Sequence, residues 1–61
     1  MIPISSTTLL GVDYENGELT VYFRNGKNYV YHNVPEDVFQ QFITSPSKGK
    51  FYNQYIKNHY R

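Results

Sequence analysis

The sequence predicts an α+β fold, in which a three-stranded antiparallel β-meander is followed by two α-helices packed on one face of the sheet. Three observations lead to this fold class. Two Asn-Gly pairs, the strongest short signal for a β-hairpin, divide the first half of the chain. Apolar residues alternate around the first pair with the period of a strand. After Pro35, they recur instead at the spacing of a helix.

Residues 1–61 are predicted to form one domain, which has to be stabilised by packing. A chain this short buries only about 60% of the surface that its unfolded form exposes. The sequence has no cysteine, which excludes disulfides and thiolate zinc sites. His32 and His59 lack the spacing of metal ligands, so we expect no metal and no other cofactor. Seven Tyr and four Phe supply the apolar area that a small core needs.

The first hairpin is predicted to turn at Asn16-Gly17, because both residues tolerate the positive φ angles of a two-residue turn. Three residue pairs then face each other across the two strands. Because side chains alternate, all six lie on the core side of the sheet. The pairs are Tyr14 with Leu19, Val12 with Val21, and Leu10 with Phe23.

Two registers fit the third strand. A two-residue turn at Asn25-Gly26 places Val30 on the core side. A three-residue loop, with Gly26 in the left-handed conformation, places Tyr29 and Tyr31 there instead. We favour the second register, because two tyrosine rings bury more apolar area than one valine. The opposite, open face of the sheet then carries Leu9, Thr20, Tyr22, Val30 and His32.

Prolines mark the limits of the two predicted helices. Pro35 suits the first helical position, and Glu36 and Asp37 suit the first turn of the first helix. Pro46 ends this helix, and Ser47 caps the second. The apolar faces of the two helices are Val38, Phe39, Phe42 and Ile43, and Phe51, Tyr52, Tyr55 and Ile56.

Charge is unevenly distributed along the chain. Residues 1–44 carry two basic and five acidic side chains, a net charge of −3, whereas residues 45–61 carry four basic side chains and no acid, a net charge of +4. Such polarity can steer an anionic partner toward the second helix. The alternative is an ordinary solvated helix face.

The strongest candidate site is the run Ser47-Lys48-Gly49-Lys50, because the first N–H groups of a helix attract anions and Gly49 lets a phosphate approach the backbone. It lacks the upstream glycine of a phosphate-binding P-loop. Lys57 and Arg61, with Lys50 and Gln54, fall at near-helical intervals and would extend the site as a basic stripe. The alternative is an ordinary helix cap, with Gly49 required for tight packing.

A second candidate surface lies on the open face of the sheet. Tyr22, Val30 and His32 could stack on bases, or they could form a patch that binds a protein or a second copy of the chain. Paired carboxylates and a Ser/His/Asp set do not stand out, so we do not expect an enzyme. Because no run approaches the roughly 18 apolar residues of a membrane span, we expect a soluble cytoplasmic protein that does not bind membranes.

The chain resembles the KTSC domain over nearly its whole length, because several short motifs occur in the order and at the spacing typical of that family. These motifs are Ser5-Ser6, Gly11-Val12-Asp13-Tyr14, Leu19-Thr20-Val21-Tyr22-Phe23, Asn25-Gly26, Tyr29-Val30-Tyr31, Val34-Pro35, Ser47-Lys48-Gly49-Lys50-Phe51-Tyr52-Asn53, Ile56 and Tyr60. The KTSC domain is found at the C-terminus of some lysyl-tRNA synthetases and as a small protein of bacteria and phages. The resemblance therefore implies RNA or tRNA as the expected partner, and a protein partner is the alternative.

Overall fold

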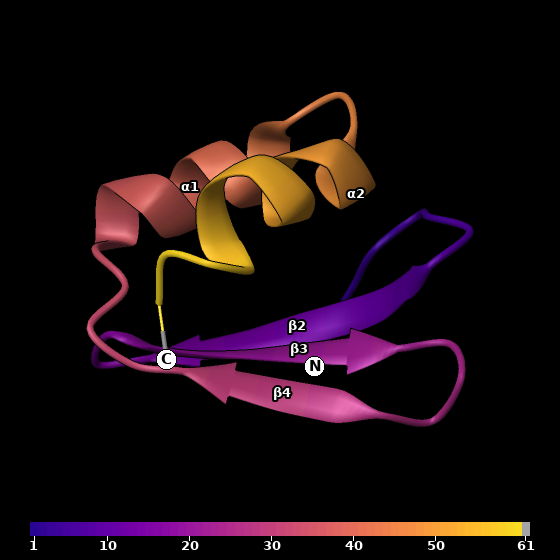
Figure 1. Cartoon of the computed structure of the whole chain (residues 1–61), viewed down its shortest axis with the longest axis horizontal. Helices are drawn as coiled ribbons and strands as arrows, with labels where there is room; N and C mark the ends of the chain where they lie inside the picture. Colours follow the sequence, from indigo (N-terminus) through magenta and orange to yellow (C-terminus); the bar gives the residue numbers. More distant parts are fainter. Residues whose placement is uncertain (61) are drawn as a thin grey trace.

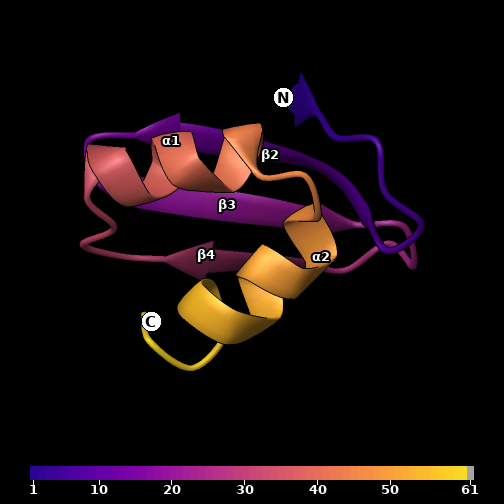
Figure 2. The same cartoon turned by 90° about the horizontal axis from the view of Figure 1, so that it is seen from above.

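The computed structural model describes residues 1–60 and has the predicted α+β architecture (Figure 1). The sheet is antiparallel, and its strands lie side by side in the order in which they occur in the chain. The helices pack together on one of its faces (Figures 1 and 2). The strands are β1 (Ile2–Pro3), β2 (Leu9–Glu15), β3 (Glu18–Phe23) and β4 (Asn28–Tyr31), and the helical segments are α1 (Glu36–Thr44), α2 (Lys48–Phe51) and the π-helical η1 (Tyr52–Ile56).

The prediction of three strands is wrong by one, because β1 adds a short strand to the outer edge of β2. It has only two residues, one of them a proline, so the sequence has no alternating pattern that would predict it. Pro3 pairs with Gly11, and a Cβ on Gly11 would lie 2.6 Å from the Met1 side chain and 2.7 Å from the carbonyl oxygen of Ile2. The N-terminal segment can approach β2 this closely only because residue 11 is a glycine.

The first hairpin has the predicted turn, and a β-bulge changes its far end. Asn16 and Gly17 both have positive φ angles, 50° and 83°, and the two pairs nearest the turn form as predicted. Phe23, however, pairs with Leu9 rather than with Leu10. The bulge inserts one extra residue into β2, so Leu9 is fully buried while Leu10 is 40% exposed. The prediction was therefore wrong for both residues, because Leu9 and not Leu10 lies on the core side of the sheet.

The third predicted strand, β4, has the register that we favoured. The N–H group of Phe23 donates to the carbonyl oxygen of Lys27 across the loop, at 2.8 Å, and Gly26 has a φ of 91°. Tyr31 lies opposite Leu19, and Tyr29 lies opposite Val21. Tyr31 is buried as predicted, but Tyr29 is 48% exposed. Two residues nearer the hairpin loop than Tyr31, it borders a surface cleft rather than the core.

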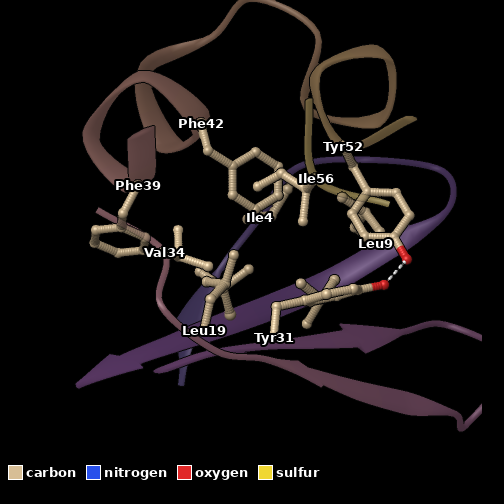
Figure 3. Close-up of a cluster of buried hydrophobic side chains, with 11 residues drawn as sticks. Ile4, Leu9, Leu19, Tyr31, Val34, Phe39, Phe42, Tyr52 and Ile56 are labelled. Atoms are coloured by element: carbon tan, nitrogen blue, oxygen red, sulfur yellow. Dashed lines mark hydrogen bonds between the residues drawn. The ribbon is translucent and has the colours of Figure 1, made fainter. Parts of the chain in front are cut away.

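The first helix ends at Thr44, shortly before Pro46, and begins one residue later than predicted. Pro35 has extended backbone angles and is the N-cap residue, not the first helical residue. Its carbonyl oxygen accepts a hydrogen bond from the N–H group of Phe39 at 3.1 Å. Phe39 and Phe42 are buried (Figure 3). Val38 and Ile43 are partly buried and pack against this core.

The second helix changes from one α-turn, α2, to a π-turn, η1. The N–H group of Lys57 donates to the carbonyl oxygen of Tyr52, five residues earlier, at 2.9 Å. Tyr52 and Ile56 are buried under this turn, as predicted. Tyr55 was predicted to join the apolar face, but it is 54% exposed and packs against the Phe51 ring at a centroid distance of 4.8 Å.

Candidate functional site

The β3–β4 loop, the segment before β2 and the start of α2 come together at one end of the molecule (Figures 1 and 2). Residues of these segments line two adjoining surface hollows. We call them the tyrosine cleft and the hydroxyl hollow. The tyrosine cleft measures about 510 Å³ and the hydroxyl hollow about 480 Å³. Thr8, Gly49 and Asn53 line both.

The tyrosine cleft combines aromatic rings with amide and ammonium groups. Its lining includes the rings Phe23, Tyr29, Tyr31 and Tyr52, the amides Asn25, Asn53 and Asn58, and the ammonium groups Lys27 and Lys57. The ring of Phe23 meets those of Tyr29 and Tyr52 edge-on, at centroid distances of 5.5 and 5.3 Å. These contacts fix the orientation of the three rings.

A hydrogen bond between the hydroxyls of Tyr31 and Tyr52 joins β4 to η1 at this cleft (Figure 3). Both side chains are largely buried, at 8% and 6% exposure. Burial, and then the hydrogen bond with Tyr31, raises the pKa of the Tyr52 hydroxyl above its ordinary value of 10.0. The Tyr52 side chain is therefore neutral over the physiological pH range and supplies a hydroxyl group rather than charge.

The hydroxyl hollow is lined by the segment before β2 and by the start of α2. Its lining includes Ser5, Ser6, Thr7, Thr8, Ser47, Lys48, Gly49 and Lys50. The hydroxyl oxygen of Ser6 accepts hydrogen bonds from the N–H groups of Thr8 and Leu9 at 3.1 and 3.2 Å. Arg24 Nε donates to the carbonyl oxygen of Ser6 at 2.7 Å, so the β3–β4 loop holds this segment in place.

The hydroxyl hollow contains all four residues of the predicted anion site, but the local geometry differs from the prediction. Ser47 is the N-cap residue, yet its side chain makes no capping hydrogen bond. Lys48 Nζ donates to the carbonyl oxygen of Ser45 at 2.8 Å, so the ammonium group folds back on the preceding loop. A Cβ on Gly49 would meet no atom within 4 Å. Tight packing therefore does not explain this glycine, which was our alternative interpretation.

The predicted basic stripe is divided between the two hollows. Lys50 lines the hydroxyl hollow and Lys57 lines the tyrosine cleft, while Gln54 lines neither. Arg61 lies outside the residues that the structure describes. The predicted residues thus lie on one connected surface, joined through Gly49 and Asn53, although they do not form a single row.

Charge is separated between the two ends of the molecule. Neither hollow is lined by an aspartate or a glutamate. Four of the five acids, Glu15, Glu18, Glu36 and Asp37, lie at the β2–β3 turn and at the start of α1, which form the opposite end (Figure 1). Neither of the two ion pairs found among residues 1–60 involves a lysine or an arginine.

Sequence reasoning missed Lys27 and the exposed ring of Tyr29 as parts of this surface. Counting charge along the chain assigned Lys27 to the acidic half. A topological signal was available: α1 runs back along the sheet, so α2 begins at the end where the β3–β4 loop lies (Figure 1).

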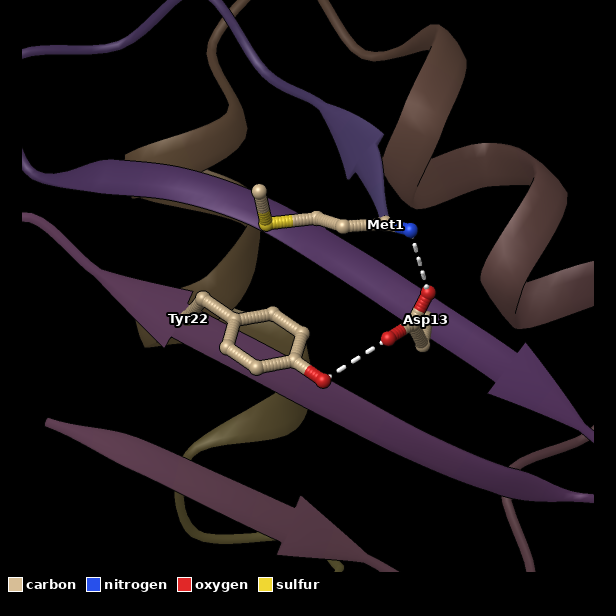
Figure 4. Close-up of polar contacts among 3 residues, drawn as sticks. All are labelled: Met1, Asp13 and Tyr22. Atoms are coloured by element: carbon tan, nitrogen blue, oxygen red, sulfur yellow. Dashed lines mark hydrogen bonds and ion pairs between the residues drawn. The ribbon is translucent and has the colours of Figure 1, made fainter.

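The open face of the sheet is partly occupied by the N-terminal segment (Figure 4). The Tyr22 hydroxyl donates to Asp13 Oδ2 at 2.7 Å, and the Met1 amino group lies 3.0 Å from Asp13 Oδ1. These two hydrogen bonds lower the pKa of the Asp13 carboxyl, and the first of them raises the pKa of Tyr22. Val30 is 42% exposed, and His32 Nδ1 lies 3.4 Å from Glu18. The hydroxyl group of Tyr22 on this face is thus already hydrogen-bonded within the chain.

Among residues 1–60, no three His, Asp or Glu side chains are placed to hold a metal ion together. In the same part of the chain, no helix has the length and apolar character that crossing a membrane requires.

Comparison with known proteins identifies the family. The model of the KTSC domain matches residues 5–60. The structure superposes on the crystal structure of a KTSC domain protein from Yersinia pestis with a TM-score of 0.92 and 36% sequence identity, over 97% of this chain and 86% of the other.

Two further relatives come from other bacteria. A protein of Tsukamurella paurometabola is 32% identical over all of this chain and 94% of its own length. An uncharacterized protein of Stutzerimonas stutzeri is 41% identical over 93% of this chain and 82% of its own length. Because the family model matches residues 5–60, almost the whole chain, the chain belongs to the KTSC domain family.

Proposed function

We propose that this chain is a non-catalytic module that binds RNA through its phosphates. The observation that carries the proposal is the pair of connected hollows, which are lined by ammonium, hydroxyl and amide groups and by no carboxylate. Lysine ammonium groups, serine and threonine hydroxyls and backbone N–H groups are the usual protein contacts to nucleic-acid phosphates. In this proposal Lys48, Lys50 and the serine and threonine hydroxyls of the hydroxyl hollow contact one stretch of the backbone, and Lys57 contacts the next.

Phosphate contacts of this kind fix the position of an RNA strand without reading its sequence. They also release counterions, so affinity falls linearly with the logarithm of the salt concentration. The proposed module therefore binds many RNA sequences with similar affinity and strong salt dependence. We also propose that the protein acts in the cytoplasm. Fractionation of cells tests this, because the protein should be recovered in the cytoplasmic fraction together with RNA.

The test compares two double variants that change the net charge by the same amount. Lys48→Gln with Lys50→Gln removes two positive charges from the hydroxyl hollow. Gln40→Glu with Gln41→Glu adds two negative charges on the exposed side of α1, away from both hollows. We expect only the first variant to weaken binding to single-stranded RNA, and to reduce the salt slope by about one unit per lost phosphate contact. Fluorescence anisotropy across a salt series measures both quantities.

Thermal unfolding of both variants shows whether the fold survives the substitutions. Equal losses of affinity in the two variants would mean that net charge acts at a distance and would exclude the hydroxyl hollow as the contact site. An absence of RNA binding even at low salt would overturn the function itself. The second candidate would then take its place, a protein-interaction module on the open face around Tyr22, Val30 and His32. It is favoured by the exposure of Val30 on the edge strand β4.

A further inference from the structure

We propose that the tyrosine cleft binds one unstacked base of the RNA, with the base on the ring of Tyr29 and the adjoining phosphates beside Lys27 and Lys57. This inference rests on the proposed function and deepens it. The proposed function concerns phosphates alone, whereas this inference adds a contact to the base. The ligand is thus a single-stranded segment whose bases are free to leave the stack, because a base in a duplex cannot enter a surface cleft.

The size and the walls of the cleft fit a nucleobase. Its volume of about 510 Å³ lies within the range of pockets that hold small organic ligands. Tyr29 is 48% exposed although it points to the helix-covered side of the sheet, so part of its ring faces the cleft rather than the core. The edge contact with Phe23, at 5.5 Å and an interplanar angle of 80°, holds that ring in one orientation. A preoriented aromatic ring on a basic surface is the usual stacking platform for single strands.

The polar groups of the cleft match the edge of a base. Asn25, Asn53 and Asn58 each carry an amide, which offers both donors and an acceptor. Asn25 Oδ1 already accepts a hydrogen bond from the N–H group of Lys27 at 3.0 Å, so the NH₂ group of Asn25 remains to donate to a ligand. Base edges present donors and acceptors side by side, and amide side chains are suited to pair with them.

The charge of the cleft selects among ligands that carry an aromatic ring. Lys27 and Lys57 line it, and no carboxylate does. A nucleotide brings a phosphate to these two ammonium groups, whereas an aromatic side chain of a neutral or basic peptide leaves them unpaired. The shared lining residues Thr8, Gly49 and Asn53 connect the cleft to the hydroxyl hollow, where the next phosphate of the same strand would bind.

The experiment measures affinity for two ligands of equal length and charge, a dye-labelled single-stranded octaribonucleotide and an abasic octamer. The variants are Tyr29→Ala and Tyr29→Phe. Tyr55→Ala is the matched control, because Tyr55 is an equally exposed tyrosine that lines neither hollow. We expect the wild-type protein to prefer the octaribonucleotide. Tyr29→Ala should lower affinity for it by roughly 5- to 150-fold, the range for losing one base stack. Tyr29→Phe and Tyr55→Ala should bind like the wild type.

Each further outcome has a distinct meaning. Equal affinity for the two octamers, or equal losses in Tyr29→Ala and Tyr55→Ala, would overturn the base site and leave the phosphate contacts standing. No binding of either octamer at low salt would overturn both proposals. A second readout is independent of stability: amide NMR shifts of Asn25, Lys27 and Asn58 should respond to the octaribonucleotide and not to the abasic octamer. Their response to an aromatic peptide instead would assign the cleft to a protein partner.

Discussion

A single glycine distinguishes the two interpretations of the start of α2. If packing required Gly49, a methyl group there would collide with neighbouring atoms, but it would meet none within 4 Å. Gly11 shows the contrasting case, because a methyl group there would lie 2.7 Å from the carbonyl oxygen of Ile2. Gly11 therefore serves the fold. Gly49 lines both hollows, where the proposed function places the phosphate backbone of the RNA.

The substitution Gly49→Ala should separate stability from binding. Alanine is the better helix former by up to about 1 kcal/mol, so we expect the variant to unfold at a slightly higher temperature than the wild type. We also expect weaker RNA binding, because the methyl group stands where the phosphate backbone would approach. Thermal denaturation and anisotropy measure the two effects. An increase in stability with unchanged RNA affinity would show that no ligand approaches this residue.

At the scale of the elements, the hydrogen bond between Tyr31 and Tyr52 is the polar link between the edge strand and the last helical turn. Removing one hydroxyl leaves the other with no partner in a largely buried position. Such a group costs about 1–3 kcal/mol, whereas removing both partners can be nearly neutral. The geometry of the pair therefore predicts strong coupling between the two residues.

We expect Tyr31→Phe and Tyr52→Phe each to lower the free energy of unfolding by about 1–3 kcal/mol, and the double variant to lie close to the wild type. Urea denaturation of the four proteins measures this double-mutant cycle. The prediction would be contradicted if the costs of the two single substitutions simply added in the double variant. That result would mean that water already satisfies each hydroxyl.

At the scale of the whole molecule, the raised pKa of Tyr52 makes the free energy of unfolding vary with pH in the alkaline range. The unfolded chain releases the Tyr52 proton near the ordinary pKa of 10.0, whereas the folded protein retains it to higher pH. Above pH 10 the unfolded state therefore binds fewer protons than the folded state, and stability falls as pH rises. Below pH 10 this contribution is present in full.

We expect the free energy of unfolding to fall as the pH rises from about 10 to about 12, and to fall less steeply in Tyr52→Phe than in the wild type. Urea denaturation at several pH values in this interval measures the difference in slope. Comparing the two slopes isolates the change that the substitution makes at the Tyr31–Tyr52 pair. Identical slopes would show that Tyr52 is not protected by the fold.

The structural features that follow from local sequence rules were predicted. The features that depend on how closely two segments approach each other were missed. The Asn16-Gly17 turn, with alternation, specified the pairing of Val12 with Val21, and aromatic area selected the register of β4. The bulge at Leu10 was hidden, because one inserted residue leaves the apolar content of β2 unchanged. The strand β1 is too short to have a period, and its docking depends on one absent Cβ at Gly11.

The candidate site was predictable only in the part that the C-terminal segment contributes. The run from Ser47 to Lys50 was found because charge and a helix start coincide there. Lys27 and Tyr29 were not, because their proximity to α2 results from the path of α1 across the sheet. Exposure of Tyr29 depends on where the second helix stops covering β4, and no local pattern encodes that limit.

The residues shared by the two hollows have a practical consequence. Thr8 lies about forty residues before Gly49 and Asn53 in the chain. A ligand that spans both hollows would therefore contact the N-terminal segment and the last helix at the same time. Such a ligand binds the folded state alone. By mass action it would stabilise that state by about 2.7 kcal/mol at a concentration one hundred times its dissociation constant. The midpoint of thermal unfolding thus becomes a reporter of occupancy, which can be read for any RNA fragment without labelling it.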